Sequence, residues 1–459
     1  MARRRLLPAL LILLLVPVSQ AEAETRRVVV RQGPFTLEPY QVRYTSRDTR
    51  KVRSPRLDGH IVRMHARVVD SHGRAMPVQQ VMLHHIVYKT RAHRDEVCGG
   101  TEAFYGTGEE NQALSFPPGY GYRIRRRDRW LTGWMLMNHR ARREIAYVEY
   151  TAWIDTSRRL QGVRPYWVRA TGCKNRRDPI FNVPGGRRPG GEFERSASWT
   201  VPRSGLLVAG GSHVHGGSRE LRLSQPRCGG RSLMVSRPLY GLPEHPYYNV
   251  LPVLHEPGPM ATSWVTSATG IPVRKGERLR VTSVYDGERP HVRVMGIWHL
   301  YLAPDSSVPR GCRRLPGDVE NALPSVPGRT EPPAVSVPLT GLDQGGRAIT
   351  IDRPPGPIVT GGRRVDLRVD DLAYRVRNLS VPLNATVRWH FHGSAYHDVS
   401  LANGPVGFAS RWSLRGDTFS RRFSTPGTYR LFCSLHPIAM TQVIDVRPTE
   451  TALQQALGG

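Results

Sequence analysis

The chain of 459 residues has only four lysines, at positions 51, 89, 174 and 275, although its net charge is +29. Nearly all of the positive charge is therefore arginine, and it is scattered along the chain, with the densest run from Arg123 to Arg129. A nucleic-acid-binding protein instead concentrates basic residues on one element with interleaved aromatic side chains. The pattern argues against a nucleic-acid partner and indicates a solvated basic surface, which is attracted to acidic surfaces such as an anionic cell envelope.

Long apolar segments and several common motifs are also missing. After the first residues, no stretch reaches the ~18 consecutive apolar residues that a transmembrane helix needs, so we expect a chain that is not transmembrane. The sequence contains no G-x-S-x-G motif, no P-loop and no dinucleotide-binding glycine motif, which leaves a hydrolase or a nucleotide-binding enzyme without support. Long amphipathic helical patterns and repeats of fixed period are absent as well.

The first residues have the order of an export signal. Arginines at positions 3 to 5 precede an apolar run that ends near Val18, and an Ala-x-Ala sequence occupies positions 21 to 23. We therefore expect residues 1–23 to be a cleaved signal peptide and the mature protein to be secreted or otherwise extracytoplasmic.

The chain has five cysteines, and in an exported protein such residues usually form disulfides. Cys98, Cys173, Cys228 and Cys312 can pair in three ways. Pairing between sequential neighbours, Cys98 with Cys173 and Cys228 with Cys312, is favoured. Cys433 then remains unpaired, and a bound metal would explain a lone thiol in an oxidising compartment.

Short runs rich in Val, Thr, Tyr and Trp, with period-two alternation, predict β-strands throughout the chain. Examples are Ile145 to Ile154, Arg278 to Tyr285 and Thr386 to Phe391. The fold class is therefore expected to be all-β, with sandwiches or barrels. Between residues 306 and 363 the chain is dense in proline and glycine, which predicts a partly extended linker.

The last segment contains a set of potential metal ligands. His397 is followed much later by the pattern Cys433-x-x-His436-x-x-x-Met440. Two imidazoles, one thiolate and a weak thioether suit copper in both oxidation states. This segment, from about 366 to 447, resembles the cupredoxins plastocyanin, pseudoazurin and azurin. The resemblance implies a Greek-key β-sandwich in which these four side chains hold one type 1 copper for electron transfer.

The N-terminal part contains further histidines at close spacing. His213 and His215 lie two residues apart, so on a strand both side chains project from one face and can chelate one metal. The adjacent His84 and His85 would point to opposite faces of a regular strand, and they can share an ion only where the strand twists or ends. Other histidines lack a partner at ligand spacing and are expected to be structural: His245, His255, His291 and His299.

Taken in order, these motifs resemble the copper type II ascorbate-dependent monooxygenases, the family of peptidylglycine alpha-hydroxylating monooxygenase and dopamine beta-monooxygenase. The resemblance runs from about 60 to 305 and implies two tandem β-sandwiches with one copper each. The first copper, which supplies electrons, would be held by His84, His85 and His139. The second, catalytic copper, which meets dioxygen, would be held by His213, His215 and Met295. The chain departs from the family at Ile86, where methionine is usual, and in the residues around His139.

These resemblances imply β-sandwiches at 24–178 and 179–305, the linker at 306–363, a cupredoxin domain at 364–448 and a tail at 449–459. One type 1 copper and up to two further copper ions are expected. In the leading hypothesis the cupredoxin passes electrons, received from a redox partner or small-molecule reductant, to a module that hydroxylates a C–H bond of an organic substrate with dioxygen. In the alternative hypothesis the chain is a non-catalytic blue-copper electron-transfer or copper-binding protein with metal-free N-terminal sandwiches.

Overall fold

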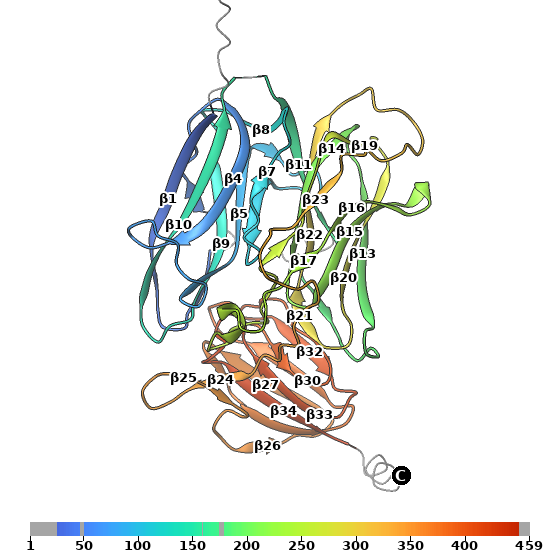
Figure 1. The fold of residues 1–459 in the computed structure, drawn as a ribbon. Coiled ribbons are helices and arrows are strands. Elements are labelled where there is room, and N and C mark those ends of the chain that lie inside the picture. Colours follow the sequence, from blue (N-terminus) through green and yellow to red (C-terminus); the bar gives the residue numbers. More distant parts are fainter. Residues whose placement is uncertain (1–24, 46–49, 158, 174–178, 449–459) are drawn as a thin grey trace, which may run out of the picture.

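The computed structural model describes residues 25–45, 50–157, 159–173 and 179–448, and these residues form an all-β molecule (Figure 1). The expected signal peptide at 1–23 and the expected tail at 449–459 lie outside the described residues. Helical structure in the described ranges is limited to two short 3-10 turns, η1 (Pro226–Cys228) and η2 (Pro246–Asn249). No helix in this part of the chain is both long enough and apolar enough to cross a membrane.

The sequence patterns correctly predicted where several strands form. β10 (Glu144–Asp155), β20 (Arg278–Asp286) and β30 (Thr386–Phe391) coincide with the alternating runs noted above. In β30 the alternation is regular: Val387, Trp389 and Phe391 are buried, while the residues between them are not fully buried. The all-β prediction is therefore confirmed, and its physical basis is the period-two burial of apolar side chains.

One ten-stranded sheet runs through both N-terminal sandwiches. Its strands in order are β1 (Thr25–Leu37), β10, β4 (Gly59–Val69), β8 (Tyr120–Ile124), β11 (Gln161–Arg169), β22 (Gly296–Pro304), β14 (Gly205–Val214), β19 (Trp264–Val273) and β23 (Glu320–Ala322), with β7 (Leu114–Ser115) paired to β4. The two halves meet where β8 and β11 pair in parallel, with Gln161 opposite Tyr120. β11 contributes Val163 to the first hydrophobic core and Val168 to the second, so the two sandwiches share this strand.

A smaller sheet covers each half. The first consists of β2 (Val42–Tyr44), β9 (Trp130–Asn138), β5 (Val81–Arg94) and β6 (Thr101–Gly108), with β3 (Arg50–Val52) on β9; the second consists of β13 (Glu192–Thr200), β20, β15 (Ser218–Gln225) and β16 (Arg231–Ser236). The first core is rich in aromatic residues, including Tyr88 and Tyr150, whose rings meet edge to face at 5.4 Å. Because both sheets of each sandwich supply buried side chains, the histidine-bearing strands β5 and β14 are held on rigid layers.

The C-terminal sandwich, orange to red in Figure 1, lies against both N-terminal ones. One sheet contains β26 (Ile358–Thr360), β29 (Asn378–Pro382), β34 (Thr441–Arg447), β33 (Gly427–Phe432) and β31 (Ser400–Asn403); the other contains β28 (Ala373–Tyr374), β27 (Arg364–Asp370), β30 and β32 (Thr418–Arg422). Its core includes Trp389, whose Nε1–H donates to Gln442 Oε1 at 2.9 Å. Met82, Met135 and Met137 of the first sandwich belong to the same buried cluster, so the C-terminal sandwich is packed onto the N-terminal part.

The stretch from 306 to 363, expected to be a linker, contains four short strands. β23 extends the ten-stranded sheet, β24 (Leu339–Leu342) and β25 (Ala348–Ile351) form a hairpin, and β26 joins the C-terminal sandwich. The remaining pairs are β12 (Phe181–Val183) with β21 (His291–Val294) and β17 (Pro238–Leu239) with β18 (Ala261–Thr262).

Four of the five cysteines form two disulfides. They join Cys98 to Cys173 and Cys228 to Cys312, which is the favoured pairing of sequential neighbours. Cys433 is free and buried, as expected.

Candidate metal centres

The first candidate centre is built on the loop between β33 and β34. Cys433 directly follows β33, and Met440 directly precedes β34. Three backbone hydrogen bonds of 3.0 Å close this loop, from Cys433 N–H to the Met440 carbonyl, from His436 N–H to the Cys433 carbonyl and from Met440 N–H to the His436 carbonyl. The antiparallel pairing of β33 with β34 therefore fixes the backbone positions from which the side chains of the loop extend.

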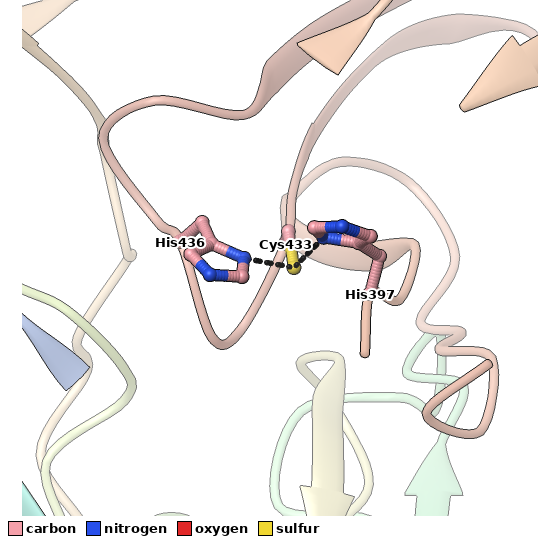
Figure 2. Close-up of side chains that lie close together, drawn as sticks. All are labelled: His397, Cys433 and His436. Atoms are coloured by element: carbon pink, nitrogen blue, oxygen red, sulfur yellow. Dashed lines mark hydrogen bonds between the residues drawn. The ribbon is translucent and has the colours of Figure 1, made fainter. Parts of the chain in front are cut away.

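The side chains of His397, Cys433 and His436 converge (Figure 2). Cys433 Sγ lies 3.6 Å from His436 Nδ1 and 4.0 Å from His397 Nδ1, and the two imidazole ring centroids are 4.9 Å apart. Cys433, His397 and Met440 are buried, and His436 is half-buried. One potential ligand atom from each of these two histidines and the cysteine lies within 4.8 Å of the others, which is the spacing that a shared metal ion requires.

Asp371 sets the orientation of one of these imidazoles. Its Oδ1 lies 2.9 Å from His397 Nε2, and because a carboxylate only accepts, Nε2 carries the proton and the lone pair of Nδ1 faces Cys433. The backbone N–H groups of Ser394 and Ala395 donate to the same carboxylate, each at 3.0 Å. A carboxylate behind a histidine is typical of metal-binding imidazoles.

The protonation states of this group follow from burial. Burial, and next the charge of Asp398, raises the pKa of the Cys433 thiol well above its ordinary value. Burial, and next the charge of His397, lowers the pKa of His436 to about 4. Without a metal, this group therefore holds a neutral thiol and a neutral imidazole at pH 7, and a metal ion must displace one proton from the thiol.

The second candidate centre lies in the N-terminal part, where two pairs of histidines meet. His84 and His85 lie on β5, and the pairing of β5 with β9 is irregular between Leu83 and His85. This β-bulge allows the two adjacent rings to approach to 5.1 Å, instead of lying on opposite faces of a regular strand. His213 lies at the end of β14 and His215 directly after it, with their Nε2 atoms 3.2 Å apart.

These two pairs form one cluster. The ring of His84 lies 5.4 Å from that of His215, and the ring of His85 lies 6.4 Å from that of His213. These four histidines, which the family resemblance assigns to two separate copper ions, are thus brought together by β5 and the end of β14. Met295, between β21 and β22, lines a cavity of about 110 Å³ with His85 and His215, and it lines a second cavity of about 640 Å³ with His85 and His213.

His139 is not brought into this cluster. It follows β9 and is buried, with Nδ1 3.1 Å from the Pro252 carbonyl oxygen. In the described part of the chain it is absent from both groups whose His, Cys, Asp or Glu donor atoms lie within 4.8 Å of one another. Burial, and next the charge of His255, lowers the pKa of His139 to about 4.

Glu109 and His255 also belong to the cluster, although the sequence patterns did not identify them as candidate ligands. Glu109 Oε1 lies 2.5 Å from His84 Nδ1 and 3.3 Å from His255 Nε2, and the three residues form the second convergent group of donors. His255, expected to be structural, therefore lies among candidate ligands, because the fold joins positions 84, 109 and 255 that no local spacing connects. The only local signal is the acidic pair Glu109-Glu110 directly after β6.

The neighbouring Glu110 acts on the other half of the cluster. Its Oε1 lies 3.1 Å from His213 Nδ1. Burial would lower the pKa of His213, but the charge and hydrogen bond of Glu110 raise it above its ordinary value. In the neutral ring, with Nδ1–H donated to this carboxylate, the lone pair of His213 Nε2 faces His215. Two adjacent carboxylates thus orient imidazoles on two sides of one cluster.

An ion pair connects the two candidate centres. Asp398, next to His397, is fully buried and accepts from the backbone N–H of Ser434 at 2.7 Å. Its Oδ2 lies 3.1 Å from a guanidinium nitrogen of Arg293, two residues before Met295. The 110 Å³ cavity is lined by His215 and Met295 and also by Phe432 and Ser434, the two residues that flank Cys433 in the chain.

Comparisons with known proteins give partial matches. No protein-family model matches the chain. It is 27% identical over 176 residues to "Probable copper-dependent oxygenase M1" of Phoma sp., a match that covers 36% of this chain and 45% of the relative, which is less than half of the relative's length. Solved structures of amicyanin variants, one oxidized and one in the Cu(I) form, are 21% and 24% identical, cover 18% of this chain and 81% of theirs, and have a TM-score of 0.17.

Proposed function

We propose that the chain is an extracytoplasmic copper oxidoreductase in which a C-terminal cupredoxin domain exchanges electrons with copper in the N-terminal sandwiches. The observation that carries the proposal is the convergence of the Cys433 thiol with the imidazoles of His397 and His436, on a loop that ends at the buried Met440. Two nitrogens, one thiolate and a weak thioether are the donors of blue-copper sites. The name of the Phoma relative, a probable copper-dependent oxygenase, points in the same direction.

The N-terminal cluster also fits copper by its donors. His213 Nε2 and His215 Nε2 face each other at 3.2 Å, and the buried Nδ1 of His85 has no hydrogen-bond partner in the described structure. We assign His213, His215 and Met295 to the catalytic copper. Of the set predicted for the first copper (His84, His85 and His139), we keep His84 as a ligand. Copper would supply one-electron transfer at the cupredoxin site and dioxygen chemistry at the cluster.

The chain's own residues prepare both sites. Asp371 holds His397 in the tautomer that offers Nδ1, and Glu110 holds His213 in the tautomer that offers Nε2. The Tyr285 hydroxyl donates to the Met295 carbonyl at 2.6 Å and accepts from the backbone N–H of His215 at 3.0 Å. This hydroxyl ties the two backbone segments that carry proposed ligands, so the donor set is preorganised before metal arrives.

Electron exchange within the chain is supported by the ion pair described above. Cys433 is covalently joined to Ser434, whose N–H binds Asp398, and Asp398 binds Arg293 at 3.1 Å. Two further peptide units lead from Arg293 to Met295. The route therefore contains only covalent bonds, one hydrogen bond and one ion pair.

A substrate would enter the larger cavity. Its volume of about 640 Å³ is in the range of pockets that hold small organic molecules. Trp167, Tyr396 and Trp412 contribute aromatic walls, and His213 and Met295 lie on the same cavity. We propose that an organic substrate binds here beside the catalytic copper and is hydroxylated at a C–H bond. The two disulfides suit an oxidising compartment outside the cytoplasm.

The first test is copper stoichiometry. Full-length protein is reconstituted with excess Cu(II), desalted and analysed for copper per chain, together with its visible spectrum and those of Cys433→Ser. We expect two or more ions per chain, and we expect the variant to lose one ion and the thiolate-to-copper absorption band. A single ion that is lost in the variant would contradict copper in the N-terminal part and favour the non-catalytic carrier. An unchanged spectrum in Cys433→Ser would refute the cupredoxin site.

The second test concerns catalysis. Met295→Ala should retain the absorption band of the Cys433 site but lose oxygen consumption in the presence of a reductant, because the proposed catalytic copper loses one ligand. Met76→Ala is the matched control, since Met76 lines neither cavity. Oxygen uptake that is the same in Met295→Ala as in the control would overturn the assignment.

A further inference from the structure

Three atoms that carry lone pairs face one another around the ring of His255. Its Nδ1 lies 2.7 Å from the backbone carbonyl oxygen of Glu256, so Nδ1 carries a proton, and in the neutral imidazole Nε2 holds a lone pair. That lone pair faces Glu109 Oε1 at 3.3 Å and Met82 Sδ at 3.2 Å. Nitrogen, carboxylate oxygen and thioether sulfur all offer lone pairs here, and without a cation between them they repel one another.

The carboxylate of Glu109 is oriented toward this point by its other oxygen. Oε2 accepts from the backbone N–H of Gly258 at 2.7 Å and from the Tyr247 hydroxyl. Oε1 is left to face His84 Nδ1 at 2.5 Å and His255 Nε2. The side chains of Glu109 and His84 are only 8% and 11% exposed, so water gives little compensation for a negative charge.

A proton alone satisfies only part of this arrangement. If His84 donates from Nδ1 to Glu109, the lone pair of a neutral His255 still faces the carboxylate, and only a second proton, on His255 Nε2, would relieve that contact. A divalent ion compensates both contacts, since it accepts lone pairs from two imidazoles and from the carboxylate oxygen. The groups behind these donors, the Glu256 carbonyl behind His255 and the Tyr247 hydroxyl behind Glu109, hold the donors as outer partners do at metal sites.

We propose that His84, Glu109 and His255 bind a divalent first-row transition-metal ion, with Met82 beside it. This mixed nitrogen and oxygen donor set differs from the set His84, His85 and His139 that the sequence resemblance implies. The site adjoins the His213–His215 pair, because the rings of His84 and His215 lie 5.4 Å apart. The inference does not depend on which ion occupies the Cys433 site.

The test compares His255, which belongs only to the proposed ligand set, with His139, which belongs only to the set that the resemblance implies. Metal-free full-length protein carrying Cys433→Ser, which removes the thiolate site, is titrated with Cu(II) alone and with Zn(II) alone. Metal per chain is measured after desalting, and dissociation constants are measured by chelator competition. His255→Gln and Glu109→Gln are compared with His139→Gln, and circular dichroism and thermal melting verify folding of each variant.

We expect His255→Gln and Glu109→Gln to weaken the binding of one ion at least ~100-fold, since loss of an outer partner alone costs 10- to 100-fold. His139→Gln should keep that ion with nearly unchanged affinity. Loss of the ion in His139→Gln together with its retention in His255→Gln would overturn the proposal, as would retention in all three variants.

Anomalous diffraction from metal-loaded crystals of the unsubstituted chain gives a second, independent measurement. The expected peak lies between His84 Nδ1, Glu109 Oε1 and His255 Nε2. A peak coordinated by His139, or no peak at a saturating metal concentration, would refute the site even if a variant fails to fold. The thiolate absorption band of Cys433 stays unchanged in either case, so failure here is distinguishable from failure of the proposed function.

Discussion

Replacement of Arg293 by methionine should destabilise the C-terminal sandwich by about 3 kcal/mol. The Arg293 and Asp398 side chains are 14% and 0% exposed, and their ion pair measures 3.1 Å. Removing one partner of a buried pair costs about 3–5 kcal/mol, because the remaining charge stays uncompensated. Hydrogen bonds from Ser434 and Ser400 still reach the Asp398 carboxylate, which places the expected loss at the lower end.

The assay is denaturant unfolding of metal-free protein, followed by tryptophan fluorescence, with Arg411→Met as the matched control. Arg411 forms an ion pair with Asp417 in the same sandwich, but its side chain is 71% exposed, so its loss should change the free energy of unfolding by less than about 0.5 kcal/mol. Methionine at position 293 keeps any cost of the left-handed backbone, where φ is 56°, so the comparison isolates the side chain. A loss below about 1 kcal/mol for Arg293→Met would refute the reasoning.

Burial lowers the pKa of the buried His291, but the carboxylates of Glu256 and Asp286, which face its ring, raise that pKa to about 9. Protonated His291 should therefore add about 3 kcal/mol to the free energy of unfolding; this contribution should be complete below pH 6.5 and lost as the pH rises through about 9. A free energy of unfolding that does not change over this pH range would contradict the prediction. Cu(II) binding at the Cys433 site at pH 7 should release one proton, from Cys433 and none from His436; the measurement is the difference in proton release between the unsubstituted chain and Cys433→Ser, by calorimetry in buffers of different ionisation enthalpy, and no difference would show that the thiol is already ionised. Replacement of Cys98 and Cys173 by serine should lower the free energy of unfolding by about 2–4 kcal/mol in denaturant titrations, and no loss would contradict a constraining role.

The predictable parts of the molecule are those encoded at short range. Strand positions such as β30 follow from the alternation of Val387, Trp389 and Phe391. The close approach of His213 and His215 follows from their spacing of two at the end of β14, and that of Cys433 and His436 from one tight loop. In each case, a few consecutive backbone angles determine the geometry.

The remaining features depend on contacts between distant segments. The bulge that brings His84 and His85 together arises where β5 shifts register against β9, which no property of the two histidines specifies. His255 reaches Glu109 because a long loop after β17 folds back over the end of β6. Sequence spacing does not reveal such contacts, so it gave no reason to count His255 among candidate ligands, whereas His139 was assigned to a ligand set from the family resemblance alone.

The shared ten-stranded sheet also determines how the two N-terminal sandwiches can move. β11 pairs with β8 of one half and β22 of the other, and Tyr301 on β22 donates to the Phe104 carbonyl across the boundary at 2.9 Å. A hinge at this boundary would have to break a run of backbone hydrogen bonds and open two cores at once. The halves therefore turn as one rigid body, and a fragment that stops near residue 178 would expose the edge of β11 to aggregation. The distance between histidines on β5 and β14 is consequently a fixed property of the fold, set before any ligand arrives.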